Sequence, residues 1–546
     1  MENDNHLKRM ERVLIRIFLV LSIVVICGIV LLIRLDTEEP SSTEEKQVLE
    51  TQQDDYVWEN GLSDSTLWLP DKCGQYEKIP DIRLEDAEGK EHLLSEYAGR
   101  KTVLVFWASW CEDCQKQMPH MKDYMKIANA IDDIQFIFVN KTDGQKETRE
   151  SAISYFDTLD IKADLMFDYN LYAYDALGMH NIPTTYFLDE EGVIISWAPK
   201  QIESESVFQA YIQDLVNGNS DATLQFIKNN LIDSEGAVHS RYEKSEEETW
   251  KSDVLSESQG LMMQYAVLKQ DKELFDTIYQ YTKSHMLLSK GLVSWMVQNG
   301  KASEVNALLD DIRIYQAVDC AQELWGGYDE EVSNLTNRFI QYGINKNGDY
   351  IDFYDSDSEQ KASRLTLCYI DLATMKHLAD ENKQLEQAYL SADQILKNGQ
   401  ISETFPLYYS WYNYEKAKYE EDDLNMAEEL VTILHLAQIG ELPDNTLEWI
   451  KSHMNSTGIK ARYDVNGQVV DGYNYDSTAV YALVVRIAQE TGENELKRQA
   501  IRKMEKMRIQ DSSLAYNGAF GMEDGSEIYS FDQIVPLLTY GYLEEE

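Results

Sequence analysis

The hydrophobic periodicity of the chain changes near residue 220, and this change limits the folds that the sequence can adopt. Before it, buried-strand runs such as KTVLVFW and IQFIFVN alternate with segments of helical spacing. After it, roughly 325 residues carry apolar positions almost only at helical spacings of three and four. One core cannot satisfy both patterns, and 546 residues exceed one ordinary domain. We therefore expect an α/β domain followed by an all-helical domain.

An apolar segment, IFLVLSIVVICGIVLLI, precedes both domains as a run of 17 uncharged residues. The run is at the short end of what spans a bilayer, and snorkelling of the flanking Arg16 and Arg34 extends it. Basic residues precede the run and acidic residues follow it, so the positive-inside rule places the N-terminus in the cytoplasm. In chain order we predict cytoplasmic residues 1–16, a transmembrane helix at 17–34 and a flexible stalk at 35–57.

This topology predicts a single-pass protein of the cell membrane with both domains extracytoplasmic. A cleaved signal peptide is the alternative interpretation of the same segment. No small-residue cleavage site follows the apolar run, and this favours an uncleaved anchor.

The formal net charge of the chain is -47. Such a surface repels phosphate polymers, so we expect no nucleic-acid partner. The six cysteines form neither the framework of a small disulfide-rich protein nor a paired metal-binding spacing with histidine. We therefore predict no metal site, and no cofactor is expected.

Two cysteines, Cys111 and Cys114, stand in the stretch WCEDC directly after a buried-strand run. The residues that follow have helical spacing, so Cys111 falls at the N-terminus of a helix. Helix amides and the helix dipole stabilise a thiolate there, which makes Cys111 the attacking sulfur and Cys114 the resolving sulfur. A structural disulfide is the alternative. Glu112 and Asp113 should disfavour the thiolate, and this indicates a reducing couple.

Roughly residues 75–216 resemble membrane-tethered bacterial thioredoxins of the TlpA/ResA type. The residues that carry the resemblance are Pro80-Asp81, Gly89-Lys90, FWASWC with Trp110, Pro119, and IPTTYFLD with Asp189 and Gly192. The resemblance implies a thioredoxin-like domain, which we place at 58–218, with Pro183 in a cis peptide bond beside Cys111. Trp110 and Pro183 would support the redox site. The resemblance also implies reduction of disulfides in an extracytoplasmic client protein, with electrons from a membrane donor.

Acidic residues interrupt apolar helix starts at three places in the second half of the chain. These are Glu257 in LSESQGLMM, Asp310 and Asp311 in NALLDDIRI, and Asp476 in GYNYDSTAVYAL. One acid in a first helical turn is usually a cap or a partner of the helix dipole. Three such places among aromatic residues indicate a site.

The order of these blocks resembles family-8 glycoside hydrolases, which are (α/α)6 barrels. The family pattern S-E-G-Q corresponds to Ser256-Glu257-Ser258-Gln259. The later blocks correspond to Asp311, Ile314, Ala317, Ala321 and Trp325, to Tyr369 in LTLCYIDL, and to Tyr473, Tyr475, Asp476 and Ser477. The resemblance implies a barrel, which we place at 219–546.

The chemistry implied by this resemblance is inverting hydrolysis of a polysaccharide, with β-1,4-linked polymers of the cell envelope or biofilm as the implied substrate class. Glu257 would be the general acid and Asp476 the general base. Asp311, together with Asp310, would hold the sugar. Trp325, Tyr369 and Tyr475 would contact the substrate.

The sequence departs from the family pattern at Leu309, Ser258, Leu261 and Met262. These departures leave an alternative open. The barrel would then be a non-catalytic glycan-binding or envelope-assembly module, and disulfide reduction would be the protein's only activity.

Overall fold

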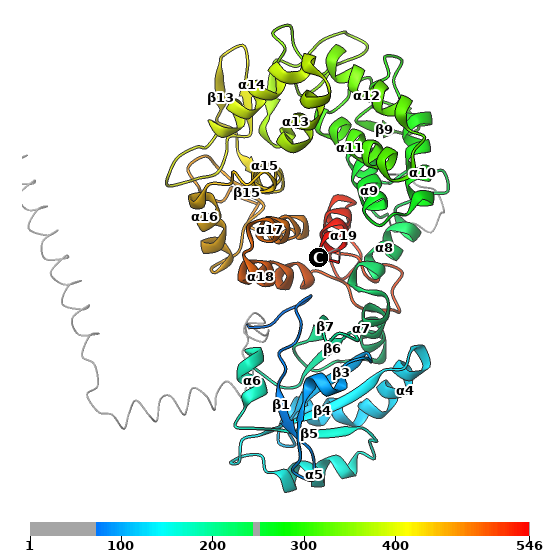
Figure 1. The fold of residues 1–546 in the computed structure, drawn as a ribbon, viewed down its shortest axis with the longest axis vertical. Helices are drawn as coiled ribbons and strands as arrows, with labels where there is room; N and C mark the ends of the chain where they lie inside the picture. Colours follow the sequence, from blue (N-terminus) through cyan, green and yellow to red (C-terminus); the bar gives the residue numbers. More distant parts are fainter. Residues whose placement is uncertain (1–71, 244–251, 545–546) are drawn as a thin grey trace, which may run out of the picture. The chain divides into compact units, whose positions relative to one another are not determined.

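A computed structural model describes residues 72–243 and 252–544 of the chain (Figure 1). All of them belong to one compact unit, residues 64–546. The predicted cytoplasmic segment, transmembrane helix and stalk lie outside the described residues. Within the described ranges, no helix combines the length and apolar character needed to cross a bilayer.

A seven-stranded sheet forms the first part of the described chain, in the order β2-β1-β5-β4-β3-β6-β7 (Figure 1). Its strands are β1 Arg83–Glu85, β2 Glu91–Leu93, β3 Thr102–Trp107, β4 Gln135–Thr142, β5 Asp164–Tyr169, β6 Thr184–Leu188 and β7 Ile194–Ala198. Strand β3 is parallel to β4 and antiparallel to β6. All six residues of β3 are buried, as expected for a central strand covered on both faces.

Helices surround this sheet and place the cysteine motif at the end of β3. They are α3 Glu112–Gln117, α4 Met121–Ile131, α5 Arg149–Thr158, α6 Tyr172–Leu177 and α7 Glu205–Asn217, with a short 3-10 helix at Leu94–Tyr97. A second 3-10 turn, Met118–His120, separates α3 from α4. Pro119, which the helical spacing predicts as a kink, lies in this turn.

The second part of the described chain is a ring of helices (Figure 1). Within the described residues, six helices form its inner layer: α9 Ser256–Leu268, α11 Leu308–Trp325, α13 Leu372–Glu381, α15 Met426–Gln438, α17 Thr478–Thr491 and α19 Phe531–Leu543. The ring closes because α19 packs against both α17 and α9. Residues of α17 are buried without interruption from Thr478 to Ala488, which is the pattern of a helix covered on all sides.

An outer layer of helices covers this ring. It comprises α8 Asn219–Asn230, α10 Lys272–Tyr281, α12 Asp329–Gln341, α14 Glu386–Lys397, α16 Asp444–Met454 and α18 Asn494–Glu505. Helix α18, for example, buries only Leu496, Ala500, Ile501 and Met504, one amphipathic face. These paired inner and outer helices agree with the helical barrel that the sequence resemblance implies.

Short strands, which the helical periodicity did not predict, lie beside the starts of inner helices. They are β8 Val254–Leu255, β9 Met296–Gln298, β10 Lys301–Ala302, β11 Arg364–Thr366, β12 Trp411–Asn413, β13 Lys418–Glu420, β14 Leu424–Asn425 and β15 Arg462–Tyr463. Each has two or three residues, too few to show the alternation by which strands are recognised in sequence. Strand β8 leads directly into α9, and β14 leads into α15.

Close approach of two backbones at Gly518 yields a test of the packing of α8. A Cβ atom at Gly518 would lie 2.5 Å from the backbone of Ala222, and its φ is 82°. Gly440 has a similar φ of 70° but no neighbouring atom within 4 Å. We predict that Gly518→Ala lowers the free energy of unfolding by roughly 3 kcal/mol or more, against about 1 kcal/mol for Gly440→Ala. Denaturant midpoints of both variants measure this, and equal shifts would contradict the packing.

Candidate functional sites

The cysteine motif forms the first candidate site, at the N-terminus of α3. Cys111 is the N-cap residue of this helix, and the backbone N–H of Cys114 donates to its Sγ at 3.3 Å. Neither thiol is in a disulfide. Cys111 is 7% exposed and Cys114 is fully buried, so only Cys111 has any access from outside.

The two thiols differ in acidity in the direction that the sequence predicts. Hydrogen bonding from the Cys114 thiol and amide lowers the pKa of Cys111, although burial opposes this. Burial raises the pKa of Cys114. Asp113 raises the pKa of Cys111, as expected, but the net direction is still downward. The predicted effect of an acidic neighbour on the thiolate therefore holds for Asp113, and the hydrogen bonds from Cys114 outweigh it. Lys116 pairs with Glu112 at 3.1 Å and with Asp113 at 2.9 Å.

The predicted redox support residues surround Cys111. The Ile182-Pro183 peptide bond is cis, and the Cys111 thiol donates to the Ile182 carbonyl at 3.4 Å. Trp110 is half-buried, and the ammonium groups of Lys141 and Lys146 face its ring at 5.7 and 5.6 Å.

Two further residues of this site have no signal in the sequence. Glu147 is fully buried and accepts hydrogen bonds from the backbone N–H (2.8 Å) and the hydroxyl (2.9 Å) of Ser109, which fixes the loop before Cys111. Lys141 is 2% exposed, and burial lowers its pKa to about 7. Both lie far from WCEDC in the chain, and only the fold brings them to it.

The second candidate site is a cluster of two carboxyl groups and one guanidinium at the starts of α9 and α11. Arg313 Nη1 lies 3.5 Å from Glu257 Oε2 and 3.5 Å from Asp310 Oδ1. The Ser256 hydroxyl donates to Asp310 Oδ2 at 2.6 Å. Gly260 permits this approach, because a Cβ there would lie only 3.1 Å from Arg313 Cβ. The glycine that ends SESQG therefore brings the two helices together.

Burial in this cluster raises the pKa of Glu257 to about 7, while Arg313 opposes the shift and Asp310 adds to it. The Glu257 side chain is still 34% exposed, so it can reach a bound molecule. A carboxyl group that holds its proton near neutral pH and is open on one side has the properties of a general acid.

The structure separates the roles of the neighbouring aspartates. Asp310 lies against Ser256 and Arg313, beside Glu257. Asp311 points to a different partner, because its Oδ2 accepts from Asn306 Nδ2 at 2.6 Å. Asn306 in turn accepts from the backbone N–H of Tyr354 at 2.7 Å. Asp311 thus holds the loop that contains Asn306, whereas Asp310 lies in the cluster with Arg313 and Glu257, and the expectation that Asp311 holds a sugar stays a prediction.

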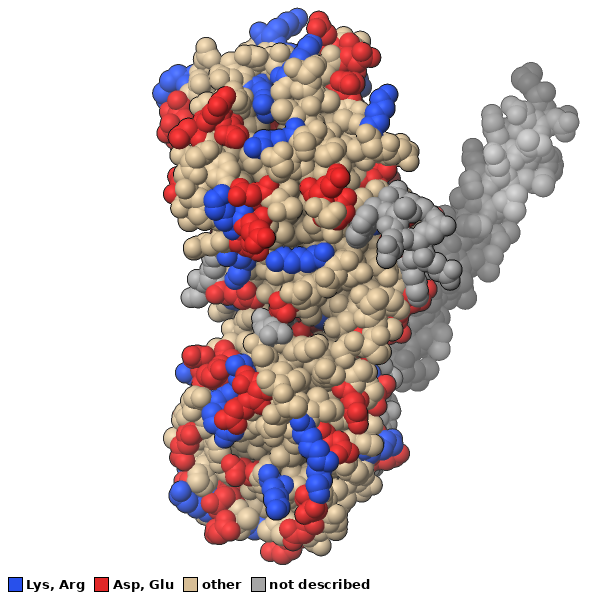
Figure 2. All heavy atoms as spheres, turned by 90° about the vertical axis from the view of Figure 1, so that its right-hand side faces the viewer, with Lys and Arg blue, Asp and Glu red and all other residues tan. Residues whose placement is uncertain are grey.

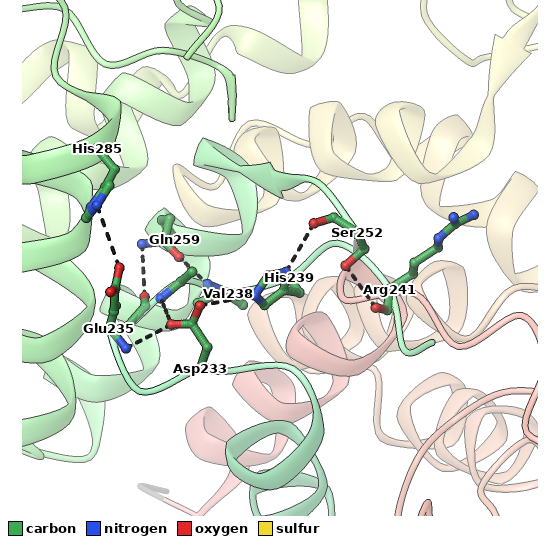
Figure 3. A network of polar contacts seen from close by, with 10 residues as sticks. Asp233, Glu235, Val238, His239, Arg241, Ser252, Gln259 and His285 are labelled. Atoms are coloured by element: carbon green, nitrogen blue, oxygen red, sulfur yellow. Dashed lines mark hydrogen bonds and ion pairs between the residues drawn. The ribbon is translucent and has the colours of Figure 1, made fainter. Parts of the chain in front are cut away.

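The remaining residues of the SESQ motif position Glu257. Gln259 is fully buried and accepts from Val238 N–H at 2.7 Å (Figure 3). Its amide nitrogen donates to the Gly236 and Ile278 carbonyls. In the same network, His239 lies between the Asp233 carboxylate (3.3 Å) and the Ser252 carbonyl (3.1 Å) (Figure 3). These contacts hold the segments on both sides of the undescribed residues 244–251 against α9.

A cleft of about 590 Å³ opens beside Glu257. Residues of its wall that the sequence did not point to include Arg241, Asp253, Gln298, Asn299, Tyr529 and Phe531. They come from segments up to 290 positions apart in the chain, Arg241 to Phe531. Their polar and aromatic side chains suit a hydroxyl-rich ligand.

Tyr369 and Glu428 belong to the surroundings of this cluster. Burial raises the pKa of Tyr369, and the charges of Asp310 and Glu428 add to the shift. Glu428 lies in the first turn of α15, and its charge also raises the pKa of Glu257. Burial raises the pKa of Glu428 itself. No motif or spacing in the sequence singles out Glu428.

Asp476 has different partners from Glu257. Its Oδ1 forms an ion pair with Lys460 Nζ at 2.8 Å, and it precedes α17. Tyr475 beside it is 54% exposed, and its ring centroid is 6.2 Å from that of Tyr473.

Trp325 does not belong to the site. It is the last residue of α11, fourteen residues after Asp311, which is about 21 Å along a helix. Its ring packs against Phe275 at 5.5 Å. The expected contact with substrate is therefore wrong, because the matching spacing extends to the far end of one long helix. Among the residues that the structure describes, no cluster of His, Cys, Asp or Glu could hold a metal ion.

The asymmetry of the two thiols leads to a prediction about reactivity. We expect iodoacetamide to alkylate Cys111 in preference to Cys114, because burial and hydrogen bonding leave Cys111 with the lower pKa and it is the more accessible residue of the two. Asp113→Asn should lower the pKa of Cys111, measured by thiolate absorbance, because Asp113 raises it. Glu112→Gln is the matched control and should leave that pKa unchanged. Equal effects of the two variants would contradict this electrostatic account.

Two family models match the chain in the regions of these sites. The AhpC/TSA family matches residues 76–196, and the Glycosyl hydrolases family 8 matches residues 215–349. Both resemblances predicted from the sequence are thereby confirmed.

Individual relatives agree with the two matches. Putative lipoprotein YdaJ of Bacillus subtilis is 31% identical over 320 residues, covering 57% of this chain and 84% of that protein. Thiol-disulfide oxidoreductase ResA of Geobacillus thermodenitrificans is 32% identical over 115 residues, covering 21% of this chain and 63% of that protein. A solved structure described as a novel alpha-amylase from Clostridium perfringens is 31% identical with a TM-score of 0.55, covering 59% of this chain and 97% of that one. The chain belongs to glycosyl hydrolase family 8 through its helical domain and to the thioredoxin-like AhpC/TSA family through its α/β domain, and it combines a glycosidase with a thiol–disulfide oxidoreductase.

Proposed function

We propose that the helical domain hydrolyses a neutral polysaccharide in the cleft beside Glu257, with inversion at the anomeric carbon. The cluster of Glu257, Asp310 and Arg313 carries this proposal. Glu257 donates its proton to the leaving glycosidic oxygen, since its pKa of about 7 keeps it partly protonated at neutral pH. Asp310 accepts a hydrogen bond from a sugar hydroxyl next to the glycosidic bond that is cut. Tyr369, whose pKa the charge of Asp310 raises, is close to Asp310.

The general base must lie on the opposite face of the sugar, with about 6.5–9.5 Å between the two carboxyl groups for the attacking water. Asp476 is the residue that the family resemblance implies. Glu428 is a second candidate, because it lies in the first turn of the inner helix α15 and its charge raises the pKa of Glu257, whereas Asp476 is paired with Lys460. We therefore propose Glu428 as the base, with Asp476 as the alternative.

The substrate class follows from the cleft and from the relatives. Among the described residues of the cleft wall, Asp253 and Glu257 face one basic residue, Arg241, and this charge balance disfavours an anionic polymer. Acidic and basic side chains are interspersed on the face shown in Figure 2, without a broad patch of one sign. The relative described as an alpha-amylase supports an α-linked glucan, and the sequence resemblance supports a β-1,4-linked one. A neutral glucan satisfies all these observations.

The position in the cell is part of the proposal. Residues 17–34 anchor the protein as a single transmembrane helix, and the stalk at 35–57 presents both domains outside the cytoplasm. The name of the relative YdaJ, a putative lipoprotein, supports an extracytoplasmic location. The Cys111–Cys114 pair then reduces disulfides of a client protein and is recharged by a membrane electron donor.

Substitution of the acid and of the base tests the mechanism. We expect Glu257→Gln to lower kcat/KM on the best glucan by roughly 10²–10⁴-fold. Glu428→Gln should be equally impaired, and sodium azide should restore its activity with formation of a glycosyl azide. Asp476→Asn is the matched comparison and should retain most activity. If azide rescues Asp476→Asn and not Glu428→Gln, then Asp476 is the general base.

The wild-type protein tests hydrolysis itself. A wild-type protein that releases no reducing ends from starch, glucan, xylan or chitosan would favour the non-catalytic alternative.

The pH dependence tests the role of Arg313. Because a cation favours the ionised carboxylate, loss of Arg313 raises the pKa of Glu257 above its value of about 7. We expect the alkaline limb of the kcat profile to move to higher pH in Arg313→Gln. Lys460→Gln removes a cation that does not contact Glu257 and should leave this limb in place. An alkaline limb that moves equally in both variants would contradict the assignment.

A further inference from the structure

A second cavity, of about 520 Å³, lies on the axis of the helical ring. Side chains from all six inner helices line it, and the cleft beside Glu257 shares only Phe531 with it. The polar residues of its wall include Gln264, Arg313, Gln316, His435, Arg486 and Gln489. Amides and charged groups are costly to bury among closely packed apolar side chains, so this wall differs from an ordinary apolar core.

The cavity extends away from the cleft. Glu257 lies in the first turn of α9, whereas Gln489 and Tyr542 lie in the last turns of α17 and α19. The inner helices start at the same end of the ring, as the contacts of Ser256 with Asp310 and of Ser477 with Asp532 show. The far end of the cavity is therefore opposite the cleft, and it is not a subsite of the same groove.

The charges of the cavity wall are compensated within the protein. Arg486 Nη2 donates to Glu490 Oε1 at 3.1 Å, and its guanidinium lies 3.4 Å from the ring centroid of Tyr542. Arg313 faces Glu257 and Asp310. An anion would find no unpaired cation here, so the charge pattern favours a neutral ligand.

Several buried polar atoms of the wall have no hydrogen-bond partner: Arg486 Nε, His435 Nδ1 and Gln489 Oε1. Arg486 is only 7% exposed. Buried polar groups are normally paired, so these atoms are available to a bound molecule that both donates and accepts. Apolar side chains such as Val431 and Leu483 lie between them and suit the C–H faces of a sugar ring.

We propose that this axial cavity is a binding site for a neutral, hydroxyl-rich molecule of mono- or disaccharide size. Its volume lies within the range of about 300–1,000 Å³ typical of small-molecule sites. A sugar supplies donors and acceptors for Arg486, His435 and Gln489 and apolar faces for the aliphatic wall. Arg313 belongs to both the cavity wall and the Glu257 cluster, so a sugar in the cavity acts on the acid through Arg313.

Equilibrium dialysis of the full-length protein with radiolabelled glucose and xylose tests the site. We expect a binding component that Gln489→Leu weakens at least tenfold and that the cleft variant Gln298→Ala retains. Leu483→Phe, which fills the cavity without removing a polar group, should remove the same component. Circular dichroism establishes that each variant is folded.

The outcomes separate this site from the proposed hydrolase. Binding that neither Gln489→Leu nor Leu483→Phe changes, or no binding beyond that lost in Gln298→Ala, would overturn the proposal and leave a water-filled cavity. Hydrolysis of glucans would be unaffected by that result. Conversely, cavity binding in a protein that cleaves no polysaccharide would support this site and overturn the proposed hydrolase.

Discussion

The contact of Arg313 with Glu257 and Asp310 is the interaction on which the helical domain's chemistry depends. Two carboxyl groups near each other in a buried place repel, and the guanidinium between them limits this repulsion. The contact exists because Gly260 lets α9 and α11 approach, and because Ser256 and Gln259 fix the start of α9. Burial then leaves Glu257 with a raised pKa and an open side toward the cleft. The residues that bring α9 and α11 together therefore also determine the pKa of Glu257.

The redox site and the glycosidase site stabilise opposite protonation states of their key residues. At Cys111, a helix N-terminus and the neighbouring thiol stabilise the ionised form, whereas at Glu257 burial stabilises the neutral form. Each site is complete within its own part of the chain. The two activities therefore need no shared residues, and their combination in one chain places a reductant and a hydrolase at the same membrane-anchored position in the proposed topology.

The sequence was sufficient where chemistry resides in a local motif. WCEDC predicted that Cys111 lies at a helix start, and SESQG predicted the same for Glu257, because helix starts and the residues beside them are local features. The sequence did not predict the features of the site that depend on packing between helices. Asp310 and Asp311 are adjacent in sequence but point to different partners. Trp325 matched a spacing yet lies at the far end of α11, and Glu428, Glu147 and the cleft wall come from distant segments. The short strands were missed because they are shorter than the pattern that identifies a strand.

Direct titration of Glu257 is the measurement that tests this account most closely. The full-length protein, labelled with ¹³C at the glutamate carboxyl carbons, would be titrated by NMR and compared with Glu257→Gln. The account predicts one carboxyl resonance that titrates near pH 7 in the wild type and is missing in the variant. If the resonance lost in Glu257→Gln titrates near the ordinary value for glutamate, about 4.3, then Glu257 is ionised at neutral pH and is not held ready to donate a proton.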